Sequence, residues 1–230
     1  RVCLRRHRLI IRYMKFLTLF AISLFTGSAI SGQAAESYLV MEANTGRVLL
    51  AYNTEKKRPV AGLTKIATAR VTLDWASLSE TSLSSYIIVP QCASLLAGSN
   101  PMQLVPGDRI QLRDALYAAL LGADSIAAHT LSIHVGQSIL QKRQLVGDAQ
   151  KTFVYEMNQL AKSLGMRRTR FTNAHGLDSH SKRAYSTASD IARISVHVMR
   201  DVGFAFYVKQ PNRTVTIVNN SGAKRSYQLK

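Results

Sequence analysis

The spacing of apolar residues along the chain changes twice, and this change limits the possible folds more than any other feature. Two apolar runs at 38–41 and 48–52 flank a joint that contains Asn and Gly, which is typical of a β-hairpin. Apolar residues then recur at three- and four-residue steps, and this predicts helices at 60–77, 112–121, 126–135, 150–164 and, behind a T-x-x-D capping box, from 187 onward. The runs 213–218 and 226–229 predict a late hairpin. The order of hairpin, helices and hairpin predicts a single α+β unit.

The first 34 residues have the pattern of a cleavable export leader. An apolar run at 16–25 follows Lys15, and small residues at 32 and 34 suit cleavage after Ala34. A retained membrane anchor is the alternative, although a spanning helix needs about 20 apolar residues. We expect residues 14–34 to be a signal peptide and 1–13 to be an upstream extension that precedes the true initiator, Met14. Residues 35–230 would then be the folded domain.

The net charge of +17 at pH 7 suggests by itself an anionic partner, such as nucleic acid or an acidic polymer. The leader carries six of the basic residues and no acidic residue, so the chain after it has a net charge of +11. We expect no nucleic-acid binding, because the sequence has no helix-turn-helix or zinc signature and export argues against it. Cys92 is the one cysteine after the leader, so no internal disulfide is expected, which suits a bacterial envelope.

A series of short motifs follows in order between residues 38 and 190. They are YLVMEANTGRVLL at 38–50, RPVAGLTK at 58–65, PGDRI at 106–110, LGMRRTRFTN at 164–173, HGLD at 175–178 and YSTASD at 185–190. Together they resemble the low-molecular-mass penicillin-binding proteins, which are serine D-Ala-D-Ala carboxypeptidases. The resemblance implies the fold of the β-lactamases and penicillin-binding proteins, a mixed α/β (α+β) fold in which a helical region backs an antiparallel sheet.

Such enzymes use three motifs that converge on one cleft, S-x-x-K, S-x-N and K-T-G. The first aligns with Gly62-Leu-Thr-Lys65, so the lysine at the general-base position is present and glycine replaces the nucleophilic serine. Thr64 cannot replace it, because Thr64 directly precedes Lys65. Adjacent residues of a helix point about 100° apart, so Thr64 does not take the place of a serine three residues before the lysine. The alternative for Lys65 is an ordinary solvated helix lysine. S-x-x-K also occurs at 179–182 and 221–224, but there it lies in polar loop sequence.

The second motif aligns with Ala123-Asp-Ser125, at the break between two predicted helices. The resemblance places Ala123 at the position of the motif's serine and Ser125 at that of its asparagine. Ala123 cannot shuttle a proton, whereas Ser125 could still donate one hydrogen bond. The alternative is a plain polar turn between helices.

The third motif has no counterpart, because neither K-T-G nor K-S-G occurs in the 230 residues. In the family this motif lies on a sheet strand beyond the late hairpin. We therefore expect the domain at 35–230 to lack its C-terminal sheet strands and to come from a truncated or degraded reading frame.

Other candidate residues have weaker support. His175 begins the HGLD segment, which the resemblance assigns to a structural loop. His129 and His134 are five residues apart on a predicted helix and diverge, so they form no metal pair. Cys92 matches no redox or metal motif and is expected to be a small packed residue. The arginines within 167–170 predict a solvated surface, and contact with an anionic envelope polymer is the alternative.

The resemblance implies hydrolysis of peptidoglycan stem peptides through an acyl-enzyme, with D-Ala-D-Ala ends as substrate, β-lactams as inhibitors of intact homologues and no cofactor or metal. Because Gly62 replaces the nucleophile and K-T-G is absent, we expect this chain to be inactive as written. The alternative is a non-catalytic protein of the same fold that binds peptidoglycan or an envelope partner. We expect export to the bacterial cell envelope, with peripheral membrane or cell-wall association as an option.

Overall fold

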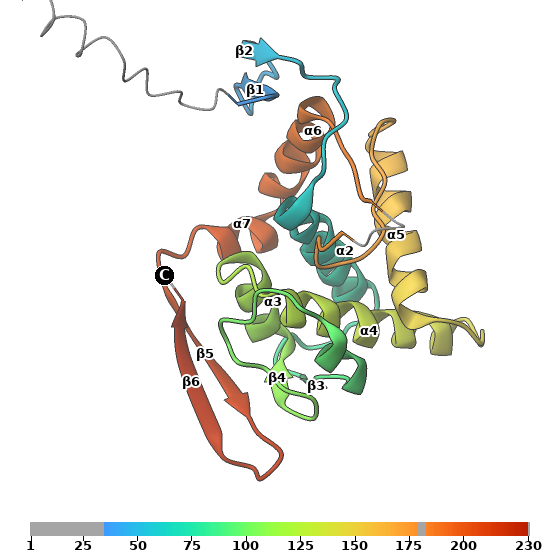
Figure 1. Cartoon of the computed structure of the whole chain (residues 1–230), viewed down its shortest axis with the longest axis vertical. Helices are drawn as coiled ribbons and strands as arrows, with labels where there is room; N and C mark the ends of the chain where they lie inside the picture. Colours follow the sequence, from blue (N-terminus) through green and yellow to red (C-terminus); the bar gives the residue numbers. More distant parts are fainter. Residues whose placement is uncertain (1–34, 179–182, 230) are drawn as a thin grey trace, which may run out of the picture. The chain divides into compact units, whose positions relative to one another are not determined.

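A computed structural model of the protein describes residues 35–178 and 183–229. The expected extension at 1–13, the expected signal peptide at 14–34 and the S-x-x-K segment at 179–182 lie outside these residues. The described elements are shown in Figure 1, and their bounds are β1 Tyr38–Met41, β2 Val48–Tyr52, the 3-10 turn η1 Ala61–Leu63, α2 Thr64–Leu78, β3 Tyr86–Ile88, the 3-10 turn η2 Gln91–Leu95, β4 Arg109–Gln111, α3 Leu112–Leu120, α4 Ser125–Lys142, α5 Ala149–Ser163, α6 Ala188–Met199, α7 Val202–Val208, β5 Arg213–Val218 and β6 Lys224–Leu229.

The predicted N-terminal hairpin is confirmed at the bounds expected from the sequence. Strands β1 and β2 pair antiparallel, with Tyr38 opposite Tyr52 and Val40 opposite Leu50. The two tyrosine rings stack with their centroids 5.8 Å apart. Gly46, in the joint, has a φ of +75°, a left-handed conformation that glycine adopts without a steric cost. The hairpin forms a sheet of its own, and β1 contacts α6.

The predicted helices are also confirmed, with small shifts at most of their ends and one large shift at the end of α4. The helix expected at 60–77 begins as the 3-10 turn η1 and continues as α2. Helix α6 starts behind Thr187, whose hydroxyl accepts a hydrogen bond from the Asp190 N–H, as the capping box predicts. Helix α4 runs seven residues beyond the predicted end at 135, through Gly136, because Ile139 still packs against the core.

The second sheet joins the late hairpin to two strands that the sequence analysis missed. Its order is β3-β4-β5-β6 and all its pairs are antiparallel. Ile87 of β3 lies opposite Ile110 of β4, and Ile110 lies opposite Ile217 of β5. Strands β3 and β4 have three residues each, which is too short for an alternating pattern to be recognised.

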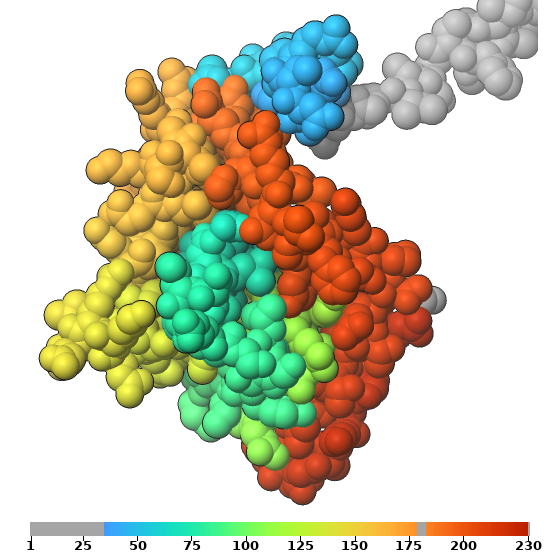
Figure 2. All heavy atoms as spheres, turned by 180° about the vertical axis from the view of Figure 1, so that it is seen from behind, coloured from blue at the N-terminus to red at the C-terminus, as the bar shows by residue number. Residues whose placement is uncertain are grey.

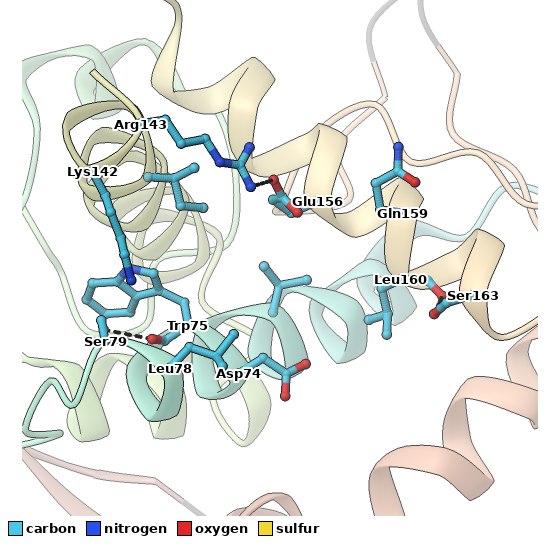
Figure 3. Close-up of a pocket in the computed structure, with 12 residues that line it drawn as sticks. Asp74, Trp75, Leu78, Ser79, Lys142, Arg143, Glu156, Gln159, Leu160 and Ser163 are labelled. Carbon is cyan, nitrogen blue, oxygen red and sulfur yellow. Dashed lines mark hydrogen bonds and ion pairs between the residues drawn. The ribbon is translucent and has the colours of Figure 1, made fainter. Parts of the chain in front are cut away.

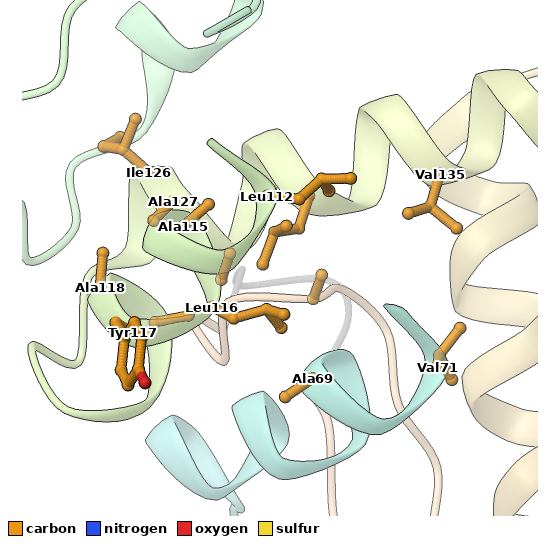
Figure 4. Packing of buried hydrophobic residues seen from close by; sticks show 14 of the residues in the cluster. Ala69, Val71, Leu112, Ala115, Leu116, Tyr117, Ala118, Ile126, Ala127 and Val135 are labelled. Carbon is orange, nitrogen blue, oxygen red and sulfur yellow. The ribbon is translucent and has the colours of Figure 1, made fainter. Parts of the chain in front are cut away.

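The core lies between the helices and the inner face of this sheet. Small residues allow the helices to approach closely, since a Cβ added at Gly136 of α4 would come within 1.9 Å of the Ala149 carbonyl oxygen of α5. Figure 4 shows the side chains of α2, α3 and α4 that meet there, among them Ala69, Leu112, Leu116, Ile126 and Val135.

Helix α2 is the central element of the helical region. It contacts α3, α4, α5, α6 and α7. From behind, its segment lies between α5 on one side and α6 and α7 on the other (Figure 2). Among the described residues, no helix has both the length and the apolar composition needed to cross a bilayer.

Candidate active site

The first motif lies where η1 passes into α2. Gly62 is exposed in η1, whereas Thr64 and Lys65 begin α2 and are buried. A Cβ added at Gly62 would meet nothing within 4 Å, so the position has room for a side chain. The hydroxyl of Thr64 has no hydrogen-bond partner among the described residues and is fully buried. Thr64 therefore does not present its hydroxyl where a side chain at 62 would lie.

Lys65 is not a solvated helix lysine, since its side chain is only 6% exposed. Its Nζ donates a hydrogen bond to the carbonyl oxygen of His175 at 3.0 Å. Burial lowers the pKa of Lys65, and the nearby carboxylate of Asp124 partly opposes this shift. A lowered pKa raises the fraction of neutral amine near pH 7, and the neutral amine is the form that can accept a proton.

The loop at 173–178 is attached to the start of α2 by several contacts. Besides the bond from Lys65, the Thr68 hydroxyl donates to the Ala174 carbonyl oxygen at 2.7 Å. Gly176 has a φ of +81°, and a Cβ added there would lie 1.9 Å from the Ala61 carbonyl oxygen. The Asn173 side chain accepts hydrogen bonds from the N–H groups of residues 175 and 176, which closes the turn. This loop packs directly against η1.

The second motif forms the N-terminus of α4. Ala123 has a φ of +50°, and Asp124 caps the helix by accepting from the Ala127 N–H at 2.9 Å. The same carboxylate accepts from the Met102 N–H at 3.2 Å and is fully buried. Burial raises the pKa of Asp124, while these N–H groups and the charge of Lys65 oppose the rise. Asp124 therefore links the second motif to the first through its electrostatic interaction with Lys65.

Ser125 meets two other loops at one point. Its N–H donates to the Ser99 carbonyl oxygen at 2.7 Å. A Cβ added at Gly98 would lie 2.7 Å from Cβ of Ser125 and 2.6 Å from Cδ1 of Leu177. The structure thus brings together the two motif positions, the loop at Gly98 and the loop at 173–178. Sequence reasoning did not single out Asp124, Gly98 or Asn173, although Asp124 is the middle residue of the second motif.

The sequence model of the D-alanyl-D-alanine carboxypeptidase family matches residues 26–228. The chain belongs to this family. The fold expected from the sequence is confirmed by solved structures. A mutant of the Streptomyces K15 DD-transpeptidase superposes with a TM-score of 0.74 at 26% identity, over 86% of this chain and 74% of that one.

Curated members of the carboxypeptidase family are similar over most of this chain. DacC of Escherichia coli is 29% identical over 195 residues, which are 78% of this chain and 46% of DacC. The D-alanyl-D-alanine carboxypeptidase of Streptomyces sp. is 26% identical over 196 residues, 84% of this chain and 64% of that protein. The D-alanyl-D-alanine carboxypeptidase DacD from Francisella tularensis, at 23% identity and a TM-score of 0.68, shows the same fold over 78% of this chain and 40% of that one. The chain thus spans between 40% and 64% of the length of these relatives.

The remaining histidines diverge, as the sequence predicts. The ring of His134 packs edge-on against Trp75, with centroids 5.5 Å apart. The ring of His129 lies instead 5.9 Å from that of His175. Within 35–178 and 183–229, no three His, Cys, Asp or Glu side chains are grouped as a metal site would require. The prediction that Cys92 is packed is wrong, because Cys92 is an exposed residue of η2.

Two further candidates from the sequence, a second S-x-x-K and a cluster of arginines, lie in loops and turns of the chain. The S-x-x-K at 221–224 spans the β5–β6 turn, where the Asn219 side chain accepts from the N–H of Ser221, and no helix follows it. The arginines at 167, 168 and 170 are exposed as predicted, and Arg168 donates to the Glu55 carbonyl oxygen at 2.9 Å.

A groove of about 650 Å³ lies apart from the motif positions, between the C-terminal half of α2, the end of α4 and α5 (Figure 3). Trp75 and Leu78 form part of its wall, and an ion pair of 2.9 Å between Arg143 and Glu156 crosses one side. No residue of the two aligned motif segments, 62–65 and 123–125, lines this groove.

Proposed function

We propose that this protein is an envelope member of the carboxypeptidase family that recognises D-Ala-D-Ala ends of peptidoglycan stem peptides without forming an acyl-enzyme. The observation that carries the proposal is the start of α2. There a buried Lys65 is held by the His175 carbonyl oxygen, one turn after a glycine whose Cβ position is open. The proton acceptor of the family's mechanism is in place, and the group that it would activate is absent.

In the family's mechanism a serine hydroxyl attacks the peptide carbonyl while the lysine accepts its proton. Gly62 has no side-chain atom that could attack, and the hydroxyl of Thr64 is fully buried. Lys65 keeps the feature that the mechanism needs, a pKa lowered by burial. We therefore assign Gly62 the nucleophile position, Lys65 the general-base position, and Ala123 and Ser125 the positions of the second motif.

Location and partners follow from the same proposal. Residues 14–34 would direct export, and the net charge of +11 after them suits an anionic cell wall. β-Lactams would then occupy the site without forming a covalent bond, because a penicillin needs the missing hydroxyl.

Labelling by a fluorescent penicillin, followed by denaturing electrophoresis, tests the missing acylation. We expect no covalent band for the wild-type chain or for the matched control Gly62→Ala. Gly62→Ser adds the hydroxyl at a position that has room for it, and a band in that variant alone would show that Lys65 can activate a nucleophile there. A band in the wild-type chain that survives denaturation would refute the proposal.

A second candidate function is binding of peptidoglycan through the basic surface rather than the cleft, and the exposed arginines at 167, 168 and 170 favour it. Sedimentation with purified sacculi at low and high salt separates the two. Retention that high salt abolishes, and that a D-Ala-D-Ala peptide does not compete for, would support the basic surface. Retention that the peptide competes away would support the cleft, and no retention at either salt would exclude both.

A further inference from the structure

The thiol of Cys92 lies beside a buried histidine. Cys92 is exposed in η2, and its Sγ is 3.3 Å from Nε2 of His129 in α4. The side chain of His129 is only 4% exposed. The thiol of an exposed cysteine and an imidazole nitrogen at this separation have the arrangement in which a base activates a cysteine.

The thiol is the one hydrogen-bond partner that the His129 side chain has in the described ranges. Its Nδ1 is buried and has no partner among the residues of 35–178 and 183–229. A buried polar group without a partner is uncommon in native proteins and calls for an explanation. Here the imidazole edge that carries Nε2 faces the thiol of Cys92, and no other side chain of the described residues hydrogen-bonds to this nitrogen.

We propose that Cys92 and His129 form a reactive thiol–imidazole pair that takes up small disulfides by thiol–disulfide exchange. The ligand class is a low-molecular-mass disulfide, R–S–S–R, which reaches the thiol from solvent. The proposal concerns a modification site in η2, beside the first turns of α4, and does not depend on whether the protein recognises D-Ala-D-Ala.

The exchange step balances without a further reactant. His129 Nε2 accepts the proton from the Cys92 Sγ–H, and the sulfur attacks one sulfur of R–S–S–R. A new S–S bond forms between Cys92 and RS, and the original S–S bond breaks. The leaving thiolate RS⁻ takes the proton back from His129 and departs as RSH. Cysteine is oxidised to the mixed disulfide, and one half of the small disulfide is reduced.

The charges around His129 keep it available as a base. Burial lowers the pKa of His129, so that the ring is neutral at pH 7. The groups that face it from neighbouring elements are the Cys92 thiol, the ring of His175 and, next to His175, the ammonium of Lys65. Neither His175 nor Lys65 supplies a negative charge that would favour protonation of His129.

The position of the pair connects it to the candidate site. His129 follows Ser125 by one turn of α4, and its ring packs against His175, whose carbonyl oxygen accepts the bond from Lys65. A mixed disulfide at Cys92 would therefore form beside the residues that hold Lys65.

The test measures how fast the full-length chain carrying Cys3→Ser reacts with the neutral probe 4,4′-dithiodipyridine. A neutral probe removes any contribution of the protein's net charge to the rate. His129→Gln removes the base, and His134→Gln is the matched control, because it lies on the same helix with its ring against Trp75. Cys92→Ser should abolish the adduct in the mass spectrum.

At pH 7.5 we expect the parent chain and His134→Gln to react about tenfold faster than His129→Gln. The pH dependence separates a base from a merely structural role. Between pH 7.5 and pH 6 the rate for His129→Gln should fall about 30-fold, because an unassisted thiol loses a factor of ten in thiolate per pH unit. The parent rate should fall less than threefold.

Equal rates and equal pH profiles for the parent chain and His129→Gln would overturn the proposal. If circular dichroism shows that His129→Gln does not fold, the parent chain provides its own reference in denaturant. A native rate at pH 6 about tenfold above the rate of the unfolded chain supports the pair, and a native rate equal to or below it refutes it.

Discussion

The helical core and the β1–β2 hairpin are both rich in apolar residues, yet only one of them buries these residues. Leu116 of α3 and Leu131 of α4 have no exposed surface, because α2, α3 and α4 pack against one another. Val48, Leu49 and Leu50 of β2 are each more than half exposed. In the described part of the chain the hairpin pairs only with itself, and its strand β1 contacts helix α6.

This difference shows that burial depends on partners rather than on composition. An isolated two-stranded hairpin is marginally stable in water, whereas helices that share a core stabilise one another. The candidate site depends on the well-packed region, since Lys65, Asp124 and the loop at 173–178 are all attached to α2 or α4. We therefore expect the site to keep its geometry even where the hairpin opens.

The largest effect should come from removing a side chain in the core. Leu116→Ala should lower the free energy of unfolding by about 4 kcal/mol, because it removes buried methylenes and leaves a cavity. Leu78→Ala, at an exposed position of α2, is the control and should change it by less than about 0.5 kcal/mol. Urea denaturation measures both. Similar losses for the two variants would contradict the distinction between core and surface.

The next largest effect is the pH dependence of stability that His175, in the loop at 173–178, should cause. Burial, together with the charges of His129 and Lys65, lowers the pKa of His175 from 6.5 to about 4. The pKa of His175 is lower in the folded chain than in the unfolded chain, so the stability that depends on a neutral His175 is fully present above pH 6.5. It is lost as the pH falls through 4. The loss should amount to about 3 kcal/mol between pH 7 and pH 4.

Urea denaturation at both pH values, on the wild-type chain and on His175→Asn, measures this contribution. The difference between the two proteins isolates His175, because the carboxylates titrate in both. The same loss of stability in both proteins would mean that His175 does not carry the effect.

Much of the fold was predictable because its signals are local. The turn at 42–47 and the capping box at Thr187 each depend on a few neighbouring residues, and the structure confirms both. Strands β3 and β4 were not predictable, since three residues cannot show a period and their pairing is set by distant partners. Helix α7 was missed as well, although Asp201 caps it.

The candidate site was predictable only where the motif spacing is preserved. The positions of Gly62, Lys65, Ala123 and Ser125 came from alignment to a family pattern. Their environment came only from the structure. The burial of Lys65 depends on His175, which lies 110 residues further along the chain. No local pattern in the sequence indicates such a contact, and the pairing of Cys92 with His129 across 37 residues was hidden for the same reason.

The third prediction compares two glycines of the helical region. Gly176 and Gly165 both have a positive φ, but only at Gly176 would a Cβ meet another backbone atom, 1.9 Å from the Ala61 carbonyl oxygen. Gly165→Ala should cost about 1 kcal/mol for the unfavourable φ alone. Gly176→Ala should cost about 2 kcal/mol more, because the loop must move away from η1. Thermal unfolding of both variants measures this difference, and equal costs would show that the loop is not held tightly against η1.

The smallest effect is expected in the hairpin and completes the comparison with the core. Leu50→Ala removes a side chain that is 60% exposed, so the free energy of unfolding should change by less than about 0.5 kcal/mol, against about 4 for Leu116→Ala. Amide hydrogen exchange adds a site-resolved measure. The β1 and β2 amides should exchange by local opening, at rates that Leu116→Ala leaves unchanged, whereas the α3 and α4 amides should exchange faster in that variant. Hairpin amides as protected as those of α4, or a cost of Leu50→Ala above about 1 kcal/mol, would show that β2 is buried against a partner in solution.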